Sequence, residues 1–401
     1  MFKTLLRGLI LACAAPLMAD ANTSIATWNL AWLMDKQTHD RWVQACRSVG
    51  WKTVEELEMA GEPVPESLSG LPYCNVHNGI DYFNNSCNEE LGRELHNRPT
   101  NVDSNDGKCR ESADLASWPK YEYKLQALRE TFQSIDKNGI TLVALQEVSN
   151  EEAVRAILPV GWNVITSASQ EHTPKIPQHV GVAWKISNNS PKNVSLLSNL
   201  SSIGNRPLRP GLQFSYDIDG KPVEFLVVHL KAGCRSQPMN TPPSNMNVAC
   251  STLAQQVREI EKWIDERVDK EFVILGDFNR SMLKELELYP IPDSSRFGNT
   301  AVGDIAVMAP EWNDDTPPGS RVHVIPHKKK SDGKLLAGDY FCGKTVGIDH
   351  VVISDRLFKR VSSSTHSLEM TPVGYVLNGQ KVPHGKDTAP PSDHCARYVQ
   401  L

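Results

Sequence analysis

The side chains best suited to chemistry in this chain stand at the ends of apolar runs. They occur in four short motifs: Trp28-Asn29-Leu30, Gln146-Glu147-Val148, Gly276-Asp277-Phe278-Asn279 and Ser392-Asp393-His394. The first three follow runs that read as buried strands, and the fourth precedes one. Acid, amide and imidazole groups are therefore expected to gather at strand ends. Carboxylate and amide oxygens suit a hard divalent cation, and an imidazole among them suits phosphate chemistry.

The elements that must position these groups follow from hydrophobic periodicity. Apolar residues at helical spacing predict a helix over 121–137, leading into the strand that carries Glu147, and a second helix over 253–268, leading into the strand that carries Asp277. Further strands are expected at 162–167, 179–185, 211–218, 222–230, 349–354 and 394–400. Asp219-Gly220 has the composition of a hairpin turn. Helices alternating with short apolar strands predict an α/β sandwich with mixed sheets.

The first 21 residues differ from the rest of the chain. Lys3 and Arg7 precede an apolar stretch and the small residues of Ala19-Asp20-Ala21, which is the pattern of a secretory signal peptide. A lipidation box ending at Cys13 is the alternative. No other window reaches transmembrane length. The chain is 40% hydrophobic, and residues 22–401 are long enough to form one large core. The protein is expected to be secreted or periplasmic.

Cysteine usage agrees with export. Eight cysteines remain after the leader, namely Cys46, Cys74, Cys87, Cys109, Cys234, Cys250, Cys342 and Cys395. An even count in an exported chain favours disulfides, and the first four lack the CxxC pairs of a zinc site. Cys234 and Cys250 close a short loop and are the expected pair, whereas the sequence leaves the other connections open.

Residues 35–117 break the pattern and are interpreted as an insertion. The segment is polar, contains four cysteines, and carries 15 acidic and 8 basic residues, a net charge of −7. The rest of the mature chain is close to neutral, so the acidic balance belongs to the insertion. It is either a lid or substrate-selecting element near Asn29, or a surface excursion without a function.

Six motifs in this order resemble the endonuclease/exonuclease/phosphatase superfamily, whose members are built like deoxyribonuclease I. The motifs are WNL, LQEV, VVHLK, GDFN, GIDHVV and SDH, and the resemblance covers about 300 residues. It implies a four-layer α/β sandwich of two packed mixed sheets flanked by helices, and hydrolysis of phosphoric esters with Mg²⁺ or Mn²⁺. A structural Ca²⁺ ion is a further expectation.

The resemblance also implies roles for the metal site. Glu147 becomes the principal ligand, Asn29 supplies an amide oxygen, and Asp393 is a further ligand. Taken singly, Glu147 could be a solvated strand end and Asn29 could cap a turn.

The same comparison assigns the catalytic groups. Asp277 orients or deprotonates the attacking water and is expected to have a depressed pKa beside the metal, while Asn279 fixes the water or a phosphate oxygen. His394, oriented by Asp349, stabilises the charge on the phosphoryl group. His229 reaches the phosphate or the leaving oxygen, although a lone histidine in an apolar strand is often a core residue. His350 is expected to be structural.

Phosphate contacts are assigned to Arg206 or Arg209 and to Lys231, and the basic segment 321–334 could follow a polyanion. A solvated charged face is the alternative for that segment. The expected protein is a monomeric nuclease, an endonuclease on DNA or RNA. Lipid phosphodiesterases, phosphomonoesterases and an inactive binding scaffold remain as alternatives. The sequence does not show the aromatic-rich hairpin with which a lipid phosphodiesterase would dock on a membrane. Inositol phosphate phosphatases of the superfamily carry an arginine at the position of His350, which makes that group less fitting.

Overall fold

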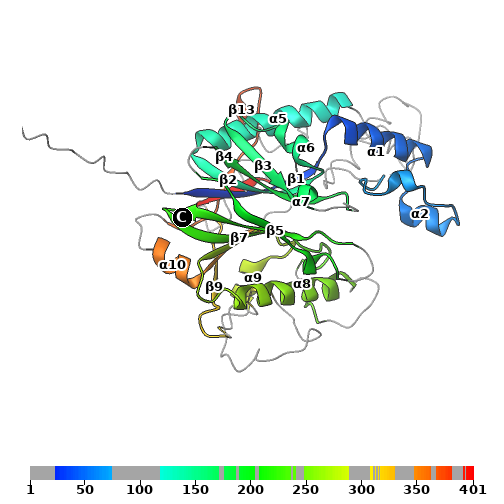
Figure 1. Ribbon diagram of the computed structural model, residues 1–401. Helices are drawn as coiled ribbons and strands as arrows, with labels where there is room; N and C mark the ends of the chain where they lie inside the picture. The colour runs from blue at the N-terminus through cyan, green and yellow to red at the C-terminus, as the bar shows by residue number, and fades with distance from the viewer. Residues whose placement is uncertain are drawn as a thin grey trace, which may run out of the picture.

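Two six-stranded sheets form the body of the molecule (Figure 1). The computed structural model describes residues 23–74, 118–170, 176–186, 189–203, 207–235, 238–240, 248–288, 308–309, 312, 315, 317–329, 347–362, 367–381, 392 and 394–401. The predicted leader, Arg206, Asp393 and the part of the insertion after residue 74 lie outside the described residues.

The first sheet combines the N-terminal strands with the C-terminal strand in the order β11-β14-β1-β2-β4-β3. Its strands are β1 (Ser24–Leu33), β2 (Ile140–Val148), β3 (Trp162–Thr166), β4 (His179–Lys185), β11 (Thr371–Val373) and β14 (Ala396–Gln400). β1 is parallel to β2 and antiparallel to β14. The two ends of the described chain therefore meet in the centre of one sheet.

The second sheet has the order β5-β6-β7-β8-β10-β9. Its strands are β5 (Lys192–Leu197), β6 (Gly211–Ile218), β7 (Lys221–His229), β8 (Phe272–Asp277), β9 (Val322–Val324) and β10 (Asp349–Ser354). β6 and β7 form the predicted hairpin, and both Asp219 (φ 53°) and Gly220 (φ 72°) have the positive φ that such a turn requires. A separate small hairpin joins β12 (Val376–Leu377) to β13 (Gln380–Lys381).

Helices cover the outer faces of both sheets. Figure 1 shows α5 and α6 over the first sheet and α8 and α9 over the second. The helices are α1 (Lys36–Ser48), α2 (Val54–Met59), η1 (Glu66–Leu68), α5 (Trp118–Lys137), α6 (Glu151–Arg155), α7 (Ser167–Gln170), η2 (Ser198–Leu200), α8 (Val248–Asp265), α9 (Met282–Leu288) and α10 (Asp355–Val361). Among the described residues, no helix is long and apolar enough to span a bilayer.

The layers follow from the alternation of side chains along each strand. In β2, Leu142 and Ala144 join the core between the two sheets, while Val143 and Leu145 join the core under α5. A third cluster packs α8 against the second sheet. Strands buried on both faces explain the continuous apolar runs of the sequence. The predicted four-layer α/β sandwich of two mixed sheets flanked by helices is confirmed.

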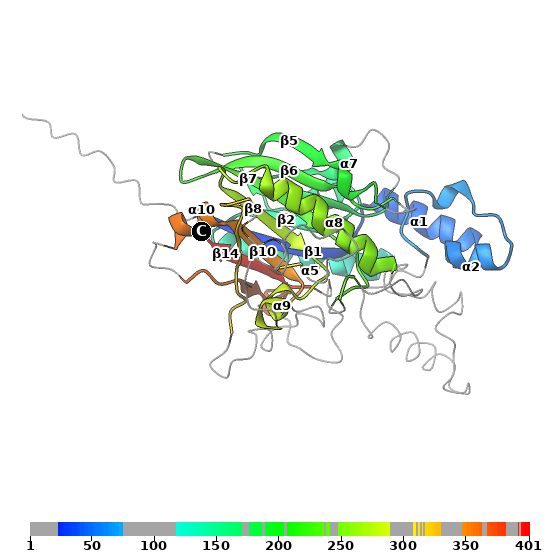
Figure 2. The same cartoon turned by 90° about the horizontal axis from the view of Figure 1, so that it is seen from below.

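Residues 35–74 of the insertion contain two helices that periodicity did not predict. α1 is capped by Asp35, and α2 begins with a capping box in which the Thr53 side chain and Glu56 bond reciprocally. A disulfide between Cys46 and Cys74 returns the chain to α1. In Figures 1 and 2, α1 and α2 project beyond the end of the sheets at which β1 finishes.

The predicted disulfide between Cys234 and Cys250 is also present. It joins the loop after β7 to the first turn of α8. Cys395 is disulfide-bonded as well. Several bonded cysteines agree with the prediction of an oxidising compartment.

Gly276 is the backbone constraint closest to the polar strand ends. Its φ is +148°, and an added Cβ would lie 1.9 Å from the carbonyl oxygen of Val228 on the neighbouring strand. Gly276→Ala is expected to lower the free energy of unfolding by about 3 kcal/mol or more, since rigid backbone on β7 must move. Gly139→Ala is the control: its φ is +73° but nothing lies within 4 Å, so the expected loss is roughly 1 to 2 kcal/mol. Denaturant unfolding checks both, and equal losses would contradict the account.

Candidate active site

Three neighbouring strands of the second sheet end in a row of polar side chains. The register pairs His229 with Asp277 in the parallel β7–β8 ladder and Asp349 with Asp277 in the antiparallel β8–β10 ladder. All three side chains are buried. Because paired residues in adjacent strands point to the same face, the register alone brings these groups together.

The first sheet contributes Asn29 and Glu147 to the same place. The side-chain amide of Asn29 donates to Glu147 Oε1 and to Asp277 Oδ2, each at 3.1 Å, and so bridges carboxylates from opposite sheets. Its oxygen accepts from the N–H of Ala31 at 2.9 Å. The sequence interpretation gave Asn29 an amide oxygen directed at a metal, whereas here the amide nitrogen faces the two acids.

The end of β1 is an irregular turn held from outside the site. Ala31 (φ 47°) and Trp32 (φ 62°) have left-handed backbone, and the β1–β2 register shifts there. Lys124 of α5 donates to the Ala31 carbonyl, and the Tyr121 hydroxyl of the same helix contacts the backbone of Trp32 and Met34. Glu147 is itself left-handed at φ 59°. The contacts from α5 stabilise the strained backbone that directly follows Asn29.

His394 and Asp349 form a close pair across the two sheets. Nδ1 of His394 lies 2.8 Å from Asp349 Oδ2, and since a carboxylate only accepts, Nδ1 donates. This leaves Nε2 facing Asp277 Oδ2 at 3.7 Å. The Trp28 indole donates to the His394 carbonyl at 3.1 Å, and Tyr375 donates to the same oxygen. The imidazole is therefore fixed in both tautomer and position.

Asp277 lies at the centre of these contacts. Its Oδ1 accepts from the Asn279 N–H at 2.7 Å, and its Oδ2 lies 3.6 Å from His229 Nε2. Burial raises the pKa of Asp277; the charge of His394 opposes that rise and the nearby carboxylate of Asp349 adds to it. The expected depressed pKa is thus not found with these protein groups alone, because desolvation outweighs their hydrogen bonds.

The surroundings of His229 disfavour its charged form. Burial, and then the charges of Arg209 and His394, hold its pKa well below the usual range. Its Nε2 lies 3.8 Å from Glu147 Oε1, and among the described residues its buried Nδ1 has no hydrogen-bond partner. The histidine therefore faces both acids and belongs to the cluster.

Arg209 supports this cluster through backbone carbonyls. Its guanidinium donates to the carbonyls of His229 at 3.0 Å and Leu230 at 2.9 Å, and to Gln178 Oε1 at 2.7 Å. It thus fixes the end of β7 as well as bringing positive charge near the acids. Lys231 is placed differently, because its ammonium donates to the carbonyl of Ala232 at 3.0 Å.

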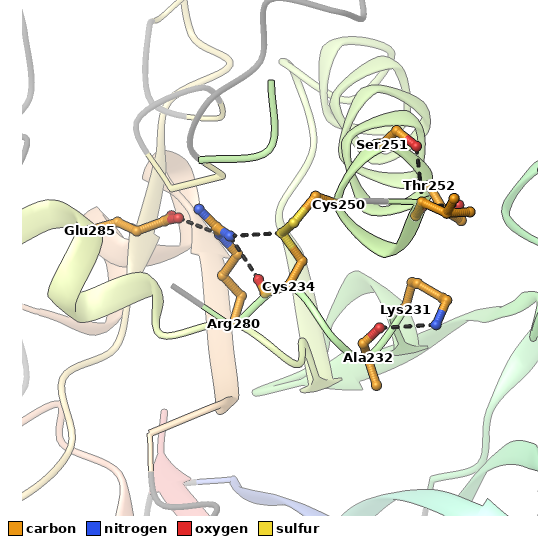
Figure 3. Close-up of a disulfide and its surroundings, with 9 residues drawn as sticks. Lys231, Ala232, Cys234, Cys250, Ser251, Thr252, Arg280 and Glu285 are labelled. Carbon is orange, nitrogen blue, oxygen red and sulfur yellow. Dashed lines mark hydrogen bonds and ion pairs between the residues drawn. A yellow bond between two sulfur atoms is a disulfide. The ribbon is translucent and has the colours of Figure 1, made fainter. Parts of the chain in front are cut away.

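The loop after β8 is tied to the disulfide loop (Figure 3). Asn279, left-handed at φ 52°, donates to the Leu230 carbonyl at 3.0 Å. The buried guanidinium of Arg280 donates to the Cys234 carbonyl at 2.7 Å and pairs with Glu285. His350, as expected, is structural: it is buried, and its Nε2 contacts the Arg280 carbonyl at 2.9 Å.

Two groups of side chains could hold a metal ion. Ligand atoms of Asp277, Asp349 and His394 lie within 4.8 Å of one another. Glu147 and Asp277, bridged by Asn29, form the second group, and the Glu147 side chain is the more open at 17% exposed. The carboxylates of both groups accept hydrogen bonds from the protein: Asp349 from His394, Asp277 from Asn29 and Asn279, and Glu147 from Asn29. Both sets of oxygen donors fit a hard cation.

Sequence reasoning missed the residues that hold these groups in place. They are Tyr121, Lys124, Gln178, Arg280, Tyr375 and Ser392, whose hydroxyl donates to the Asn29 carbonyl at 2.7 Å. The only available signal was that polar side chains such as Lys124 and Thr131 interrupt the apolar face of a predicted helix. That signal does not name a partner.

Several solved structures are similar to this chain. An endonuclease/exonuclease/phosphatase family protein from Bacteroides thetaiotaomicron is 11% identical, with a TM-score of 0.40, over 70% of this chain and 89% of that one. Truncated Caenorhabditis elegans TDP2 is 12% identical, with a TM-score of 0.40, over 70% and 92%. The human Nocturnin catalytic domain is 12% identical, with a TM-score of 0.37, over 69% and 85%.

Neither a protein-family model nor a curated protein matches the sequence. The two packed mixed sheets with flanking helices agree with the four-layer sandwich that the sequence motifs imply.

The bridging amide of Asn29 generates a test of the cation site. Asn29→Asp places a third carboxylate against Glu147 and Asp277, and like charges at this distance destabilise a buried cluster. In chelator the melting temperature is expected to fall below that of the wild type, and Mg²⁺ or Mn²⁺ is expected to restore more of the loss than in Asn29→Ala. Differential scanning calorimetry checks this. A cation response identical in all three proteins would contradict a site at Glu147 and Asp277.

Proposed function

We propose that this chain is an exported member of the endonuclease/exonuclease/phosphatase superfamily, a divalent-metal-dependent phosphodiesterase that acts as a nuclease. The observation that supports this most directly is the meeting of Glu147, Asp277 and the Asp349–His394 pair where the ends of two packed sheets adjoin. Two acids, an oriented imidazole and a neutral imidazole suit hydrolysis of a phosphoric ester.

Glu147 and Asp277 would hold the cation, with Asn29 spacing their carboxylates. When bound, Mg²⁺ or Mn²⁺ supplies positive charge at a phosphate oxygen and favours ionised acids around it. Asp393 stays a predicted further ligand.

The other side chains of the site have separate roles in the proposed hydrolysis. Asp277 orients the attacking water, and the N–H of Asn279 fixes one oxygen of its carboxylate. Nε2 of His394, with the tautomer set by Asp349, faces the phosphoryl oxygens. His229 contacts the scissile phosphate or the leaving oxygen from the other side of Asp277.

A nucleic-acid substrate is favoured by the segment after β9. From Val324, which pairs with Val352, the chain runs toward the site, and His327 donates to the Asp349 carbonyl at 2.9 Å. Lys328 and Lys329 follow immediately and are exposed. Exposed cations beside a phosphoryl-transfer site suit a polyanionic backbone. Residues 330–334 of this basic segment lie outside the described residues.

Glu147→Gln and His394→Ala are each expected to lower hydrolysis by at least about a hundredfold with the fold intact. Purified protein is assayed with Mg²⁺, Mn²⁺ or Ca²⁺ on plasmid DNA, single-stranded RNA, sphingomyelin and a phosphomonoester, and circular dichroism verifies folding. Glu151→Gln, at a half-buried position on α6 outside the cluster, is the control and should keep full activity. Near-full activity of either site variant would refute the assignment, and hydrolysis of sphingomyelin alone would replace the nuclease by a lipid phosphodiesterase.

The basic segment is tested by salt. For a nuclease, log affinity for DNA or RNA falls linearly with log salt, by roughly 0.7 to 0.9 per phosphate contact. Replacing Lys328, Lys329 and Lys330 with glutamine is expected to flatten this slope while turnover of a small phosphodiester stays nearly unchanged. The matched control replaces Lys262 and Lys270, which lie at the far end of α8 and after it. An unchanged slope means that the segment is a solvated face.

A further inference from the structure

A small cavity lies between the insertion and the segment before β4. Its volume is about 230 Å³, and its lining is largely apolar: Leu68, Leu71, Tyr73, Ile176, Pro177 and Pro207 belong to it. The first three come from residues 35–74 of the insertion and the others from the main body. The cavity exists only because the insertion packs here.

This cavity adjoins the candidate active site through two residues. Pro177 lines it, and the next residue, Gln178, accepts from Arg209 at 2.7 Å. Arg209 in turn holds the carbonyls of His229 and Leu230. Tyr73 lies near enough to Arg209 to influence the pKa of the guanidinium, as do Glu147 and Asp277. The contacts of Arg209 thus connect the wall of the cavity at Pro177-Gln178 with the end of β7 at His229.

Tyr73 is the most accessible aromatic side chain of this wall. It is 46% exposed, and its ring packs against the edge of Trp32 with 6.4 Å between ring centroids. The next residue, Cys74, is joined to Cys46 of α1 by the disulfide. The ring is thus held by covalent and aromatic contacts while one side stays open.

The charge of the wall excludes phosphate as its occupant. Residues 35–74 carry seven acidic and four basic side chains, and Glu55 is the charged residue in the lining. A phosphate would meet repulsion there, whereas an uncharged planar ring would bury apolar surface against Tyr73 and the two prolines.

We propose that this cavity is a subsite for a nucleobase next to the scissile phosphate, with Tyr73 as the stacking residue. The insertion is then a substrate-selecting element: the main body performs the chemistry, and the wall made of Leu71 and Tyr73 selects a phosphodiester that carries a ring on one side. This inference rests on the proposed function and specifies its substrate.

The test compares thymidylyl-thymidine with two analogues, each lacking one of the two bases. Wild-type protein is expected to prefer the full compound over one analogue by roughly tenfold to a hundredfold in kcat/KM, the range that stacking on an aromatic side chain gives. Tyr73→Ala is expected to lose that factor on the full compound and to leave the disfavoured analogue unchanged. Tyr73→Phe keeps the ring and the preference. Tyr123→Ala removes an equally exposed tyrosine, on α5, and serves as the control.

Equal losses on all three compounds, or no loss, would overturn the subsite. Equilibrium binding of the same compounds to Glu147→Gln protein, with and without Tyr73→Ala, separates this outcome from failure of the proposed function. If no compound is hydrolysed but Tyr73→Ala still weakens binding of the full compound selectively, the subsite stands and the catalytic proposal fails. If the wild type cleaves the full compound, but Glu147→Gln protein binds it equally well with and without Tyr73→Ala, the nuclease proposal stands and the subsite is wrong.

Discussion

The structure depends on one bridging contact, in which the Asn29 amide donates to Glu147 and to Asp277. Glu147 belongs to the first sheet and Asp277 to the second, so the contact fixes how the two sheets meet at this end. Both acids follow apolar strands whose inner faces pack against each other. The apolar core between the two sheets therefore sets the distance between the carboxylates of Glu147 and Asp277. A small shift of one sheet against the other would break the contacts of Asn29 before it exposed much apolar surface.

Burial of these charges explains the surroundings of the site. Asp277, Asp349, His229 and His394 are all nearly inaccessible, and buried ionisable groups require partners or an altered pKa. Asp349 satisfies its need through His394, while Asp277 receives one backbone and one amide donor. The ligand atoms of Asp277, Asp349 and His394 lie close enough together to hold a metal ion, and burial keeps the pKa of His229 well below its usual range.

The loops at the ends of the strands are held by specific side-chain contacts. The disulfide between Cys234 and Cys250 and the buried pair of Arg280 and Glu285 fix the loops that follow β7 and β8. On the other side, Tyr121 and Lys124 of α5 hold the irregular end of β1, from which the insertion departs. Residues 35–74 are consequently anchored to the same backbone that presents Asn29.

The sequence alone determined the strands that carry the polar motifs, the hairpin at Asp219-Gly220 and the disulfide of Cys234 and Cys250, because periodicity, turn composition and short loop length are local properties. It did not predict β5, β9 or the short strands β11, β12 and β13. It also placed Asn29, Glu147, Asp277 and His394 at strand ends. Only the tertiary structure decided that Asn29 directs its amide nitrogen at the acids, that burial raises the pKa of Asp277, that Arg209 holds carbonyls, and that Cys46 pairs with Cys74. These outcomes depend on desolvation and on donors far away in the chain, which the order of residues does not encode locally.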